Sequence, residues 1–277
     1  MTIARWLNDD CMNRMTKDLR FLLKMIRASD GELELALRGK YFNLYYRGNS
    51  LAKVVFLASG RYRVEISSEF CRDSLACTDP RFSALASESV GNKTVLVLPP
   101  DLLHPFFQGK HLRDFRSRIK KRSYSEEITY EQMVITDNIG RDDLLIIDRQ
   151  VTDSVCPGRM DVLALRQVNG EQYRFLILEV KLGNNPELKG EVAEQLERYV
   201  SHINAHFDSY RDCYERVYFQ KKQLGLIDSP SHRAIEIVKD VEARVVVIGY
   251  SGMARSATNH LVSAHPSVEV QQFSYLL

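Results

Sequence analysis

Two apolar runs joined by a turn, with charged residues inside them, constrain this chain more than any other stretch. The runs are Met160–Leu165 and Phe175–Leu182, and an Asn-Gly pair between them is a turn signal, so we predict two paired strands. Asp161 interrupts the first run, and Glu179 and Lys181 interrupt the second. Because burying charge is costly unless it is paired or binds a metal, these residues indicate a functional site.

Side chains alternate between the two faces of a strand, which divides the second run into two sets. Glu179 and Lys181 fall on one face, and an apolar set falls on the other. We therefore expect a carboxylate and an ammonium group close together near the end of a buried strand. The polar face also holds Phe175 and Ile177, and the apolar face holds Leu176, Leu178, Val180 and Leu182.

The three charged residues follow a pattern that resembles the signature of the PD-(D/E)XK nuclease superfamily. Seventeen residues separate Asp161 from Glu179, and Lys181 completes an E-x-K triplet. In this superfamily an Asp and a Glu from adjacent strands hold a divalent metal ion, and the Lys positions or activates the attacking water. Met160 stands where the motif has Pro, a position that varies widely among relatives.

The stretch after the second run adds to the resemblance. Asn185 and Pro186 match the preferences for a helix cap and a first helical position. Gln195 and Tyr199 on the following helix are similar to the Q-x-x-x-Y element of many of these nucleases. Gln195 lies at the border of the buried stripe of this helix, so we expect it to overlook the strand ends.

The resemblance implies a metal-dependent nuclease with a restriction-endonuclease-like core, a mixed α/β sheet flanked by helices. Asp161 and Glu179, with the backbone carbonyl of Val180, would bind Mg²⁺ or Mn²⁺, and Lys181 would orient the water or stabilise developing charge. The expected partner is nucleic acid, with DNA favoured, and a homodimer stays open. The alternative is a non-catalytic nucleic-acid-binding or protein-interaction module that keeps the fold.

A glutamate on the helix before the first strand is a further candidate, since many of these nucleases carry one near the metal site. Glu131 lies within the apolar arc of a predicted helix, together with Ile128 and Val134. An ionised carboxylate is tolerated there only beside a cation. Either the metal or Lys181 supplies that cation, or Glu131 pairs with an arginine at the seam between domains.

The chain divides into two predicted domains, an N-terminal accessory domain over 1–122 and the nuclease-like domain over 123–277. The second begins at a capping box, Ser123 to Glu126. The accessory domain is predicted to be α+β, with an antiparallel meander of about four strands. Its expected segments are a helix over 8–29, strands between 33 and 67, an irregular connection over 68–93 and a strand over 94–98. In the second domain we expect strands over 144–151, 243–250 and 268–273 and helices over 210–224 and 253–263.

Basic residues are concentrated in one segment, although the net charge of the whole chain is only +2. Between residues 110 and 122, seven basic residues stand against Asp114 alone. Such a segment predicts a phosphate-binding surface, and a solvated helix face explains it equally well. The seven are Lys110, Arg113, Arg116, Arg118, Lys120, Lys121 and Arg122.

Several other classes of protein are not supported. No apolar run is long enough to span a bilayer, and the N-terminus does not have the pattern of a signal peptide. Five cysteines without a C-x-x-C pair favour reduced thiols. We therefore expect a cytoplasmic protein. Glycine-rich phosphate loops are missing. His202 and His206 have a zinc-compatible spacing but no third ligand, so we expect ordinary helix histidines.

Overall fold

The computed structural model describes residues 3–122, 125–156, 158–228, 230, 232–266 and 268–274, with the backbone alone for 86–90. The chain forms two compact units. The N-terminal unit consists of Ala4–Ile128 and Gln220–Ile227, and the C-terminal unit consists of Met1–Ile3, Thr129–Phe219 and Asp228–Leu277. The predicted boundaries did not anticipate that Gln220–Ile227 belongs to the N-terminal unit.

The N-terminal unit is built on a six-stranded antiparallel sheet of order β1-β2-β3-β4-β6-β5. The predicted meander is confirmed as its first four strands, and β6 is the strand predicted before the Pro-Pro pair. The strands are β1 (Leu33–Leu37), β2 (Tyr41–Tyr46), β3 (Asn49–Phe56), β4 (Tyr62–Ser67), β5 (Ala86–Val90) and β6 (Lys93–Leu98).

The single helix predicted over 8–29 is wrong, because two helices, α1 (Asp9–Lys17) and α2 (Arg20–Arg27), take its place. The chain bends at Asp18, whose carboxylate accepts a hydrogen bond from the Tyr62 hydroxyl at 2.6 Å. The bend leaves Leu19 fully buried in the core. A tertiary contact that the helical period cannot reveal therefore decides the break.

The irregular connection predicted over 68–93 is also wrong. It contains α3 (Ser68–Cys71), α4 (Pro80–Ser83) and β5. A disulfide joins Cys71 to Cys77, so the prediction of reduced thiols fails for these two residues. The segment orders because it adds the buried rings of Phe70 and Phe82 to the core.

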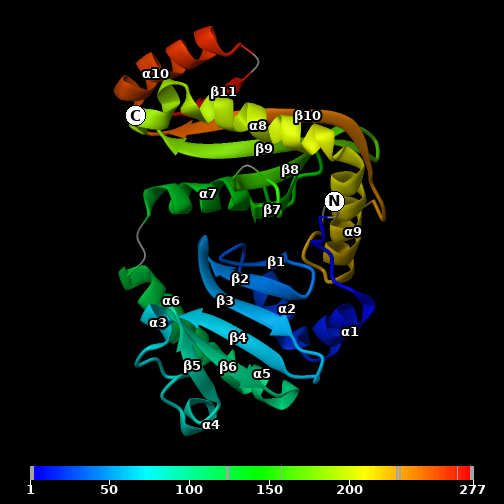
Figure 1. Cartoon of the computed structure of the whole chain (residues 1–277), viewed down its shortest axis with the longest axis vertical. Helices are drawn as coiled ribbons and strands as arrows, with labels where there is room; N and C mark the ends of the chain where they lie inside the picture. The colour runs from blue at the N-terminus through cyan, green and yellow to red at the C-terminus, as the bar shows by residue number, and fades with distance from the viewer. Residues whose placement is uncertain are drawn as a thin grey trace. The chain divides into compact units, whose positions relative to one another are not determined.

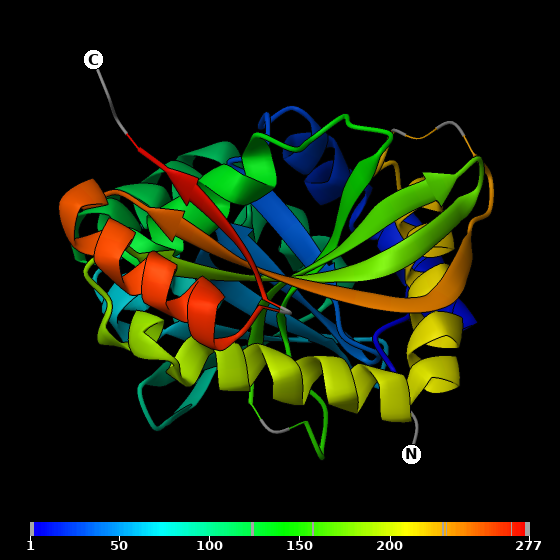
Figure 2. The same ribbon diagram turned by 90° about the horizontal axis from the view of Figure 1, so that it is seen from above.

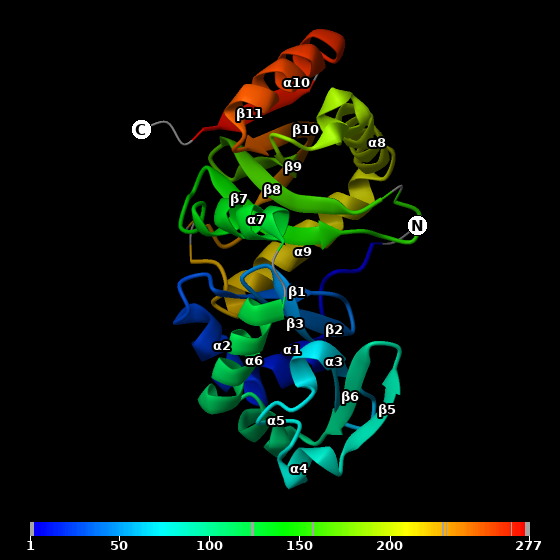
Figure 3. The same cartoon turned by 90° about the vertical axis from the view of Figure 1, so that its left-hand side faces the viewer.

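One hydrophobic core holds this unit together. Helices α1, α2, α5 (Pro100–Phe106) and α6 (Gly109–Arg122) pack on one face of the sheet (Figure 3). The sheet contributes alternate residues, as in β4, where every second side chain is buried. The basic segment forms α6, as predicted, and its apolar side faces the core.

The C-terminal unit contains a five-stranded mixed sheet of order β11-β10-β9-β8-β7. Strand β8 runs antiparallel to its neighbours β7 and β9, whereas β10 is parallel to β9 and to β11. The predicted fold class, a mixed sheet flanked by helices beside an α+β unit with a meander, is thereby confirmed. The strands are β7 (Leu144–Val151), β8 (Met160–Asn169), β9 (Gln172–Leu182), β10 (Glu236–Ile248) and β11 (Glu269–Phe273).

Helices cover both faces of this sheet (Figures 1 and 2). On one face, α7 packs Ile135 against Val162 and Leu178. On the other face, α9 packs Tyr210 and Tyr214 against Phe175. The helices are α7 (Glu126–Thr136), the 3-10 turn η1 (Pro186–Lys189), α8 (Glu191–Ala205), α9 (Phe207–Gln223) and α10 (Ser251–Ala264).

The capping box and the absence of a membrane span were both predicted from the sequence. Residues 123 and 124 of the predicted capping box lie outside the described residues. Within the described ranges, every helix is too short or too polar to cross a membrane.

Candidate active site

The register of β8 and β9 brings the predicted carboxylates together. Val162 pairs with Leu178, and both belong to the apolar cluster beneath α7. The preceding residue, Asp161, therefore falls in line with Glu179 on the opposite face. The two strands are also joined at this point, since the backbone N–H of Val180 donates to Asp161 Oδ2 at 3.2 Å.

Glu179 is an almost fully buried carboxylate, with 2% of its surface exposed. Its Oε1 accepts from Gln195 Nε2 at 3.1 Å and lies 3.2 Å from Lys181 Nζ. Its Oε2 is buried and has no hydrogen-bond partner among the described residues. Burial, followed by the negative charge of Asp161, raises the pKa of Glu179 to about 8. An additional cation beside this carboxylate would stabilise its ionised form.

Lys181 is held as an ammonium group between two carboxylates. Its Nζ lies 3.2 Å from Glu179 Oε1 and 2.6 Å from Glu187 Oε2. Burial disfavours the charged amine, but Glu179 and Glu187 outweigh burial and raise the pKa of Lys181 above its usual value. Lys181 is therefore suited to stabilising negative charge rather than to accepting a proton.

Gln195 reaches the carboxylates from α8. Its amide Nε2 donates both to Glu179 Oε1 and to the hydroxyl of Tyr199, the latter at 2.8 Å. Tyr199 in turn packs against the loop before β8, where a Cβ atom at Gly158 would lie 2.5 Å from the tyrosine oxygen. The structure thus places Gln195 in contact with Glu179, from the helix that follows the two strands.

Glu131 lies at the buried side of α7, and its cation is Arg149 of β7 rather than Lys181. Arg149 Nη2 donates to Glu131 Oε1 at 2.5 Å, and Gln150 Nε2 donates to Glu131 Oε2 at 3.0 Å. The same Gln150 amide lies 3.5 Å from Asp161 Oδ1. Burial raises the pKa of Glu131 to about 7, Arg149 counteracts this shift, and Asp161 adds to it. Glu131 is thus linked to Asp161 through one glutamine.

Three residues of this network were not predicted: Arg149, Gln150 and Glu187. Asp148 and Arg149 interrupt the apolar run of β7, which is the same signal that identified Asp161. Gln150 adopts a positive φ of 51°, which the sequence does not show. Glu187 follows Pro186 in the turn after β9, where its distance to Lys181 depends on the tertiary fold.

The donor set fits a hard divalent cation. Asp161 and Glu179 contribute two neighbouring carboxylates with Lys181 as their cation, whereas both oxygens of Glu131 are bound by Arg149 and Gln150. Oxygen ligands and a surplus of negative charge are what Mg²⁺ and Mn²⁺ prefer. Across the described residues, no set of three or more His, Cys, Asp or Glu side chains is arranged around one point. The predicted ligand set needs only two such side chains, with the carbonyl of Val180 as a third ligand.

His202 has a structural partner of its own. Its Nε2 lies 2.8 Å from Asp153 Oδ2, which also accepts from the Tyr210 hydroxyl at 2.8 Å. The other oxygen of Asp153 accepts the backbone N–H groups of Val155 and Cys156. This cluster fixes the loop that leads into β8.

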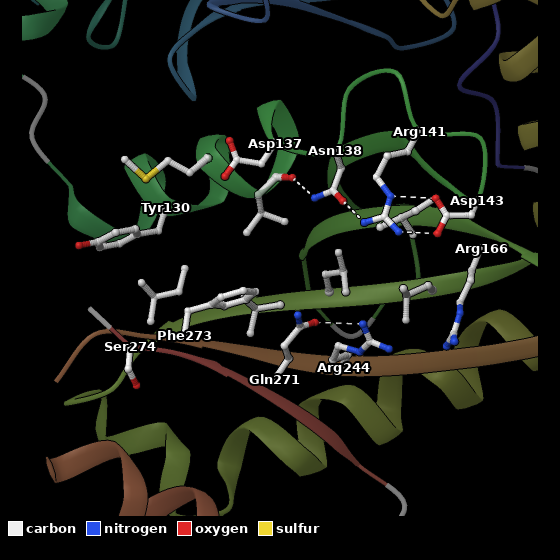
Figure 4. Close-up of a pocket in the computed structure, with 17 residues that line it drawn as sticks. Tyr130, Asp137, Asn138, Arg141, Asp143, Arg166, Arg244, Gln271, Phe273 and Ser274 are labelled. Carbon is white, nitrogen blue, oxygen red and sulfur yellow. Dashed lines mark hydrogen bonds and ion pairs between the residues drawn. The ribbon is translucent and has the colours of Figure 1, made fainter. Parts of the chain in front are cut away.

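A cavity of about 680 Å³ lies on the other face of the sheet, beneath α7 (Figure 4). Its floor is apolar, and the carboxylates of Asp161 and Glu179 do not line it. Its guanidinium groups are bound within the unit, since Arg141 pairs with Asp143, and Arg244 donates to Gln271. The cavity is therefore separate from the carboxylate site.

The seven basic residues of α6 fall into two groups. Arg116 lies 3.8 Å from Glu32 and stacks on the ring of Tyr46, and Arg118 binds Asp114 and the carbonyl of Arg72. These two side chains are committed to contacts within the N-terminal unit. The exposed members are Lys110, Arg113, Lys120, Lys121 and Arg122.

No protein-family model and no curated sequence matches this chain. Two solved structures were found. A repair endonuclease from Pyrococcus abyssi is 12% identical, with a TM-score of 0.27 over 87% of this chain and 77% of that one. An EndoMS structure in complex with double-stranded DNA is 10% identical, with a TM-score of 0.25 over 88% and 78%.

Proposed function

We propose that this chain is a metal-dependent nuclease that hydrolyses phosphodiester bonds of nucleic acid, with DNA as the expected substrate. One observation carries the proposal. The carboxylates of Asp161 and Glu179 lie together on one face of the sheet with the ammonium group of Lys181, and Glu179 Oε2 is buried with no hydrogen-bond partner in the part of the chain that the structure describes. A buried carboxylate left in this way is costly unless it is protonated or a cation completes its surroundings, and its raised pKa shows how strongly the ionised form calls for a cation.

The protein groups have distinct roles in this proposal. Asp161 and Glu179 hold Mg²⁺ or Mn²⁺, aided by the carbonyl of Val180. When bound, the ion supplies Lewis acidity toward a phosphate oxygen and lowers the pKa of a coordinated water. Lys181, which stays positively charged, stabilises the negative charge that develops on the phosphoryl oxygens. Gln195 orients Glu179 by donating to its Oε1.

Glu131 supports the site indirectly, through Gln150. Arg149 fixes its carboxylate, and Gln150 links it to Asp161. When Glu131 is ionised, above its raised pKa of about 7, its negative charge near Asp161 increases the attraction of the site for a cation. Glu131 is therefore proposed as a positioning residue.

Substrate binding is assigned to the exposed basic residues of α6. Lys120, Lys121 and Arg122 form the last turn of this helix, where cations are also favoured by the helix dipole. Contacts from such side chains to phosphates are independent of sequence and depend strongly on salt.

Cleavage assays test the proposal. Purified protein is incubated with labelled single-stranded, double-stranded and branched DNA and with RNA, with Mg²⁺, with Mn²⁺ or with EDTA. We expect cleavage of a DNA substrate that requires a divalent ion and is lost in Glu179→Gln. Salt-dependent binding without cleavage under every condition would indicate the non-catalytic binding module instead.

A further inference from the structure

The turn after β9 places a second carboxylate on Lys181. Glu187 Oε2 lies 2.6 Å from Lys181 Nζ, closer than the 3.2 Å that separates this atom from Glu179 Oε1. The Glu187 side chain is 40% exposed, whereas the Glu179 side chain is 2% exposed. The ammonium group is therefore shared between an inner and an outer carboxylate.

The turn that carries Glu187 is fixed at both ends. Asn185 Oδ1 accepts the backbone N–H of Glu187 at 2.9 Å, and the carbonyl of Glu187 accepts from Gly190 at 3.2 Å. At the start of the turn, a Cβ atom on Gly183 would overlap the carbonyl oxygen of Gly249 and approach Ala254. This close approach to α10 requires glycine. Glu187 is thus presented to Lys181 from a rigid support.

We propose that Glu187 is a positioning residue that draws the Lys181 ammonium group away from Glu179, so that Glu179 keeps oxygen available for a divalent cation. This role rests on the proposed function. Without Glu187, the ammonium group would be left with Glu179 as its carboxylate partner. An ion pair between Lys181 and Glu179 competes with a metal ion for the same buried carboxylate. Glu187 also offsets the positive charge of Lys181, which would otherwise repel the ion.

A double-mutant cycle on metal binding tests this role without relying on activity. Mn²⁺ is titrated calorimetrically into four folded proteins: the wild type, Glu187→Gln, Lys181→Ala and the double variant. Glu187→Gln keeps the shape of the side chain and removes its charge, so we expect Mn²⁺ to bind about ten-fold more weakly. In the Lys181→Ala background the same substitution should change the affinity less than about two-fold, because the ammonium group it controls is gone.

The matched control is Glu191→Gln, which removes an exposed carboxylate from the first turn of α8. It should leave Mn²⁺ affinity close to that of the wild type. Equal losses from Glu187→Gln in both backgrounds, or no loss in either, would overturn the positioning role while leaving the proposed nuclease intact. Failure of the wild type to bind Mn²⁺ at millimolar concentration would overturn the proposed function and this role with it.

Discussion

Glu65 in β4 and Glu179 in β9 are both strand glutamates with a basic residue two positions away, yet their surroundings differ. Glu65 lies on the half-exposed face of its strand, with 13% of its side chain exposed, and Arg63, Lys53 and Lys93 lie 3.0, 3.7 and 3.8 Å from it. Glu179 is 2% exposed, meets Lys181 and lies beside a second carboxylate. Glu65 thus has three cationic partners, whereas Glu179 has one cationic partner and a carboxylate beside it. Spacing alone does not define a site, but burial beside another carboxylate does.

The largest effect should come from removing the charge of each glutamate in turn. Glu179→Gln should lower the single-turnover cleavage rate by about a thousand-fold or more, because it removes a metal ligand from the reacting centre. Glu65→Gln should leave the rate within about two-fold, because a surface ion pair contributes little beyond local stability. Similar rates for the two variants would end the distinction between the glutamates.

The buried carboxylate of Glu131 should make stability depend on pH. Its folded pKa of about 7 exceeds the ordinary value of 4.5, so the folded state keeps a proton that the unfolded state has released. The stability from this group is complete below about pH 4.5 and falls as pH rises through 7. Between pH 5 and 8 the free energy of unfolding of the wild type should fall by on the order of 3 kcal/mol relative to that of Glu131→Gln.

Urea unfolding of both proteins across this pH range measures the difference. Glu194→Gln, at an exposed position on α8, is the control and should follow the wild type. If the free energy of unfolding changes with pH in the same way for the wild type and Glu131→Gln, Arg149 keeps Glu131 ionised throughout this range.

Gln195 should have a smaller effect, since it orients Glu179 without carrying charge. Gln195→Ala should reduce cleavage by about ten-fold and leave cleavage measurable, a loss in the usual range for a residue that supports a metal ligand. Gln195→Glu adds a third carboxylate beside Asp161 and Glu179 and should shift the metal requirement to lower concentration, because the added negative charge attracts the cation. Cleavage measured against Mg²⁺ concentration separates the two effects, and an unchanged profile in both variants would remove Gln195 from the site.

The two groups of basic residues in α6 allow the same kind of comparison. Replacing Lys120, Lys121 and Arg122 by Ala should flatten the salt dependence of DNA binding by about 0.9 units of log–log slope per lost phosphate contact. Replacing Arg116 and Arg118 should instead lower the stability of the N-terminal unit, since both bind groups of their own unit. An unchanged slope in the first variant would assign α6 to structure alone.

The sequence was sufficient for much of the fold because strands and helices carry their own periodicity. It predicted β7 to β9 and the face that Glu179 and Lys181 share, since alternation is a local property. It missed the break at Asp18, which depends on Tyr62, and the disulfide between Cys71 and Cys77. Both depend on contacts between segments rather than on local pattern.

The same limit applied at the site. Asp161, Glu179 and Lys181 could be predicted as site residues because charge inside an apolar strand is visible in the sequence. The partner of Glu131 could not be predicted, because its pairing with Arg149 depends on how α7 lies across β7. Gln150 could not be predicted either, because neither its positive φ nor its contacts with Glu131 and Asp161 are visible in the sequence.

The most direct test of the central claim is anomalous diffraction from crystals soaked in Mn²⁺. We predict one strong anomalous peak within coordination distance of both the Asp161 and the Glu179 carboxylates, with Lys181 beside it and bound to Glu187. The peak should disappear in Glu179→Gln crystals treated in the same way. A wild-type crystal with Mn²⁺ bound elsewhere, and with Glu179 still bonded to Lys181 and Gln195 alone, would contradict the account.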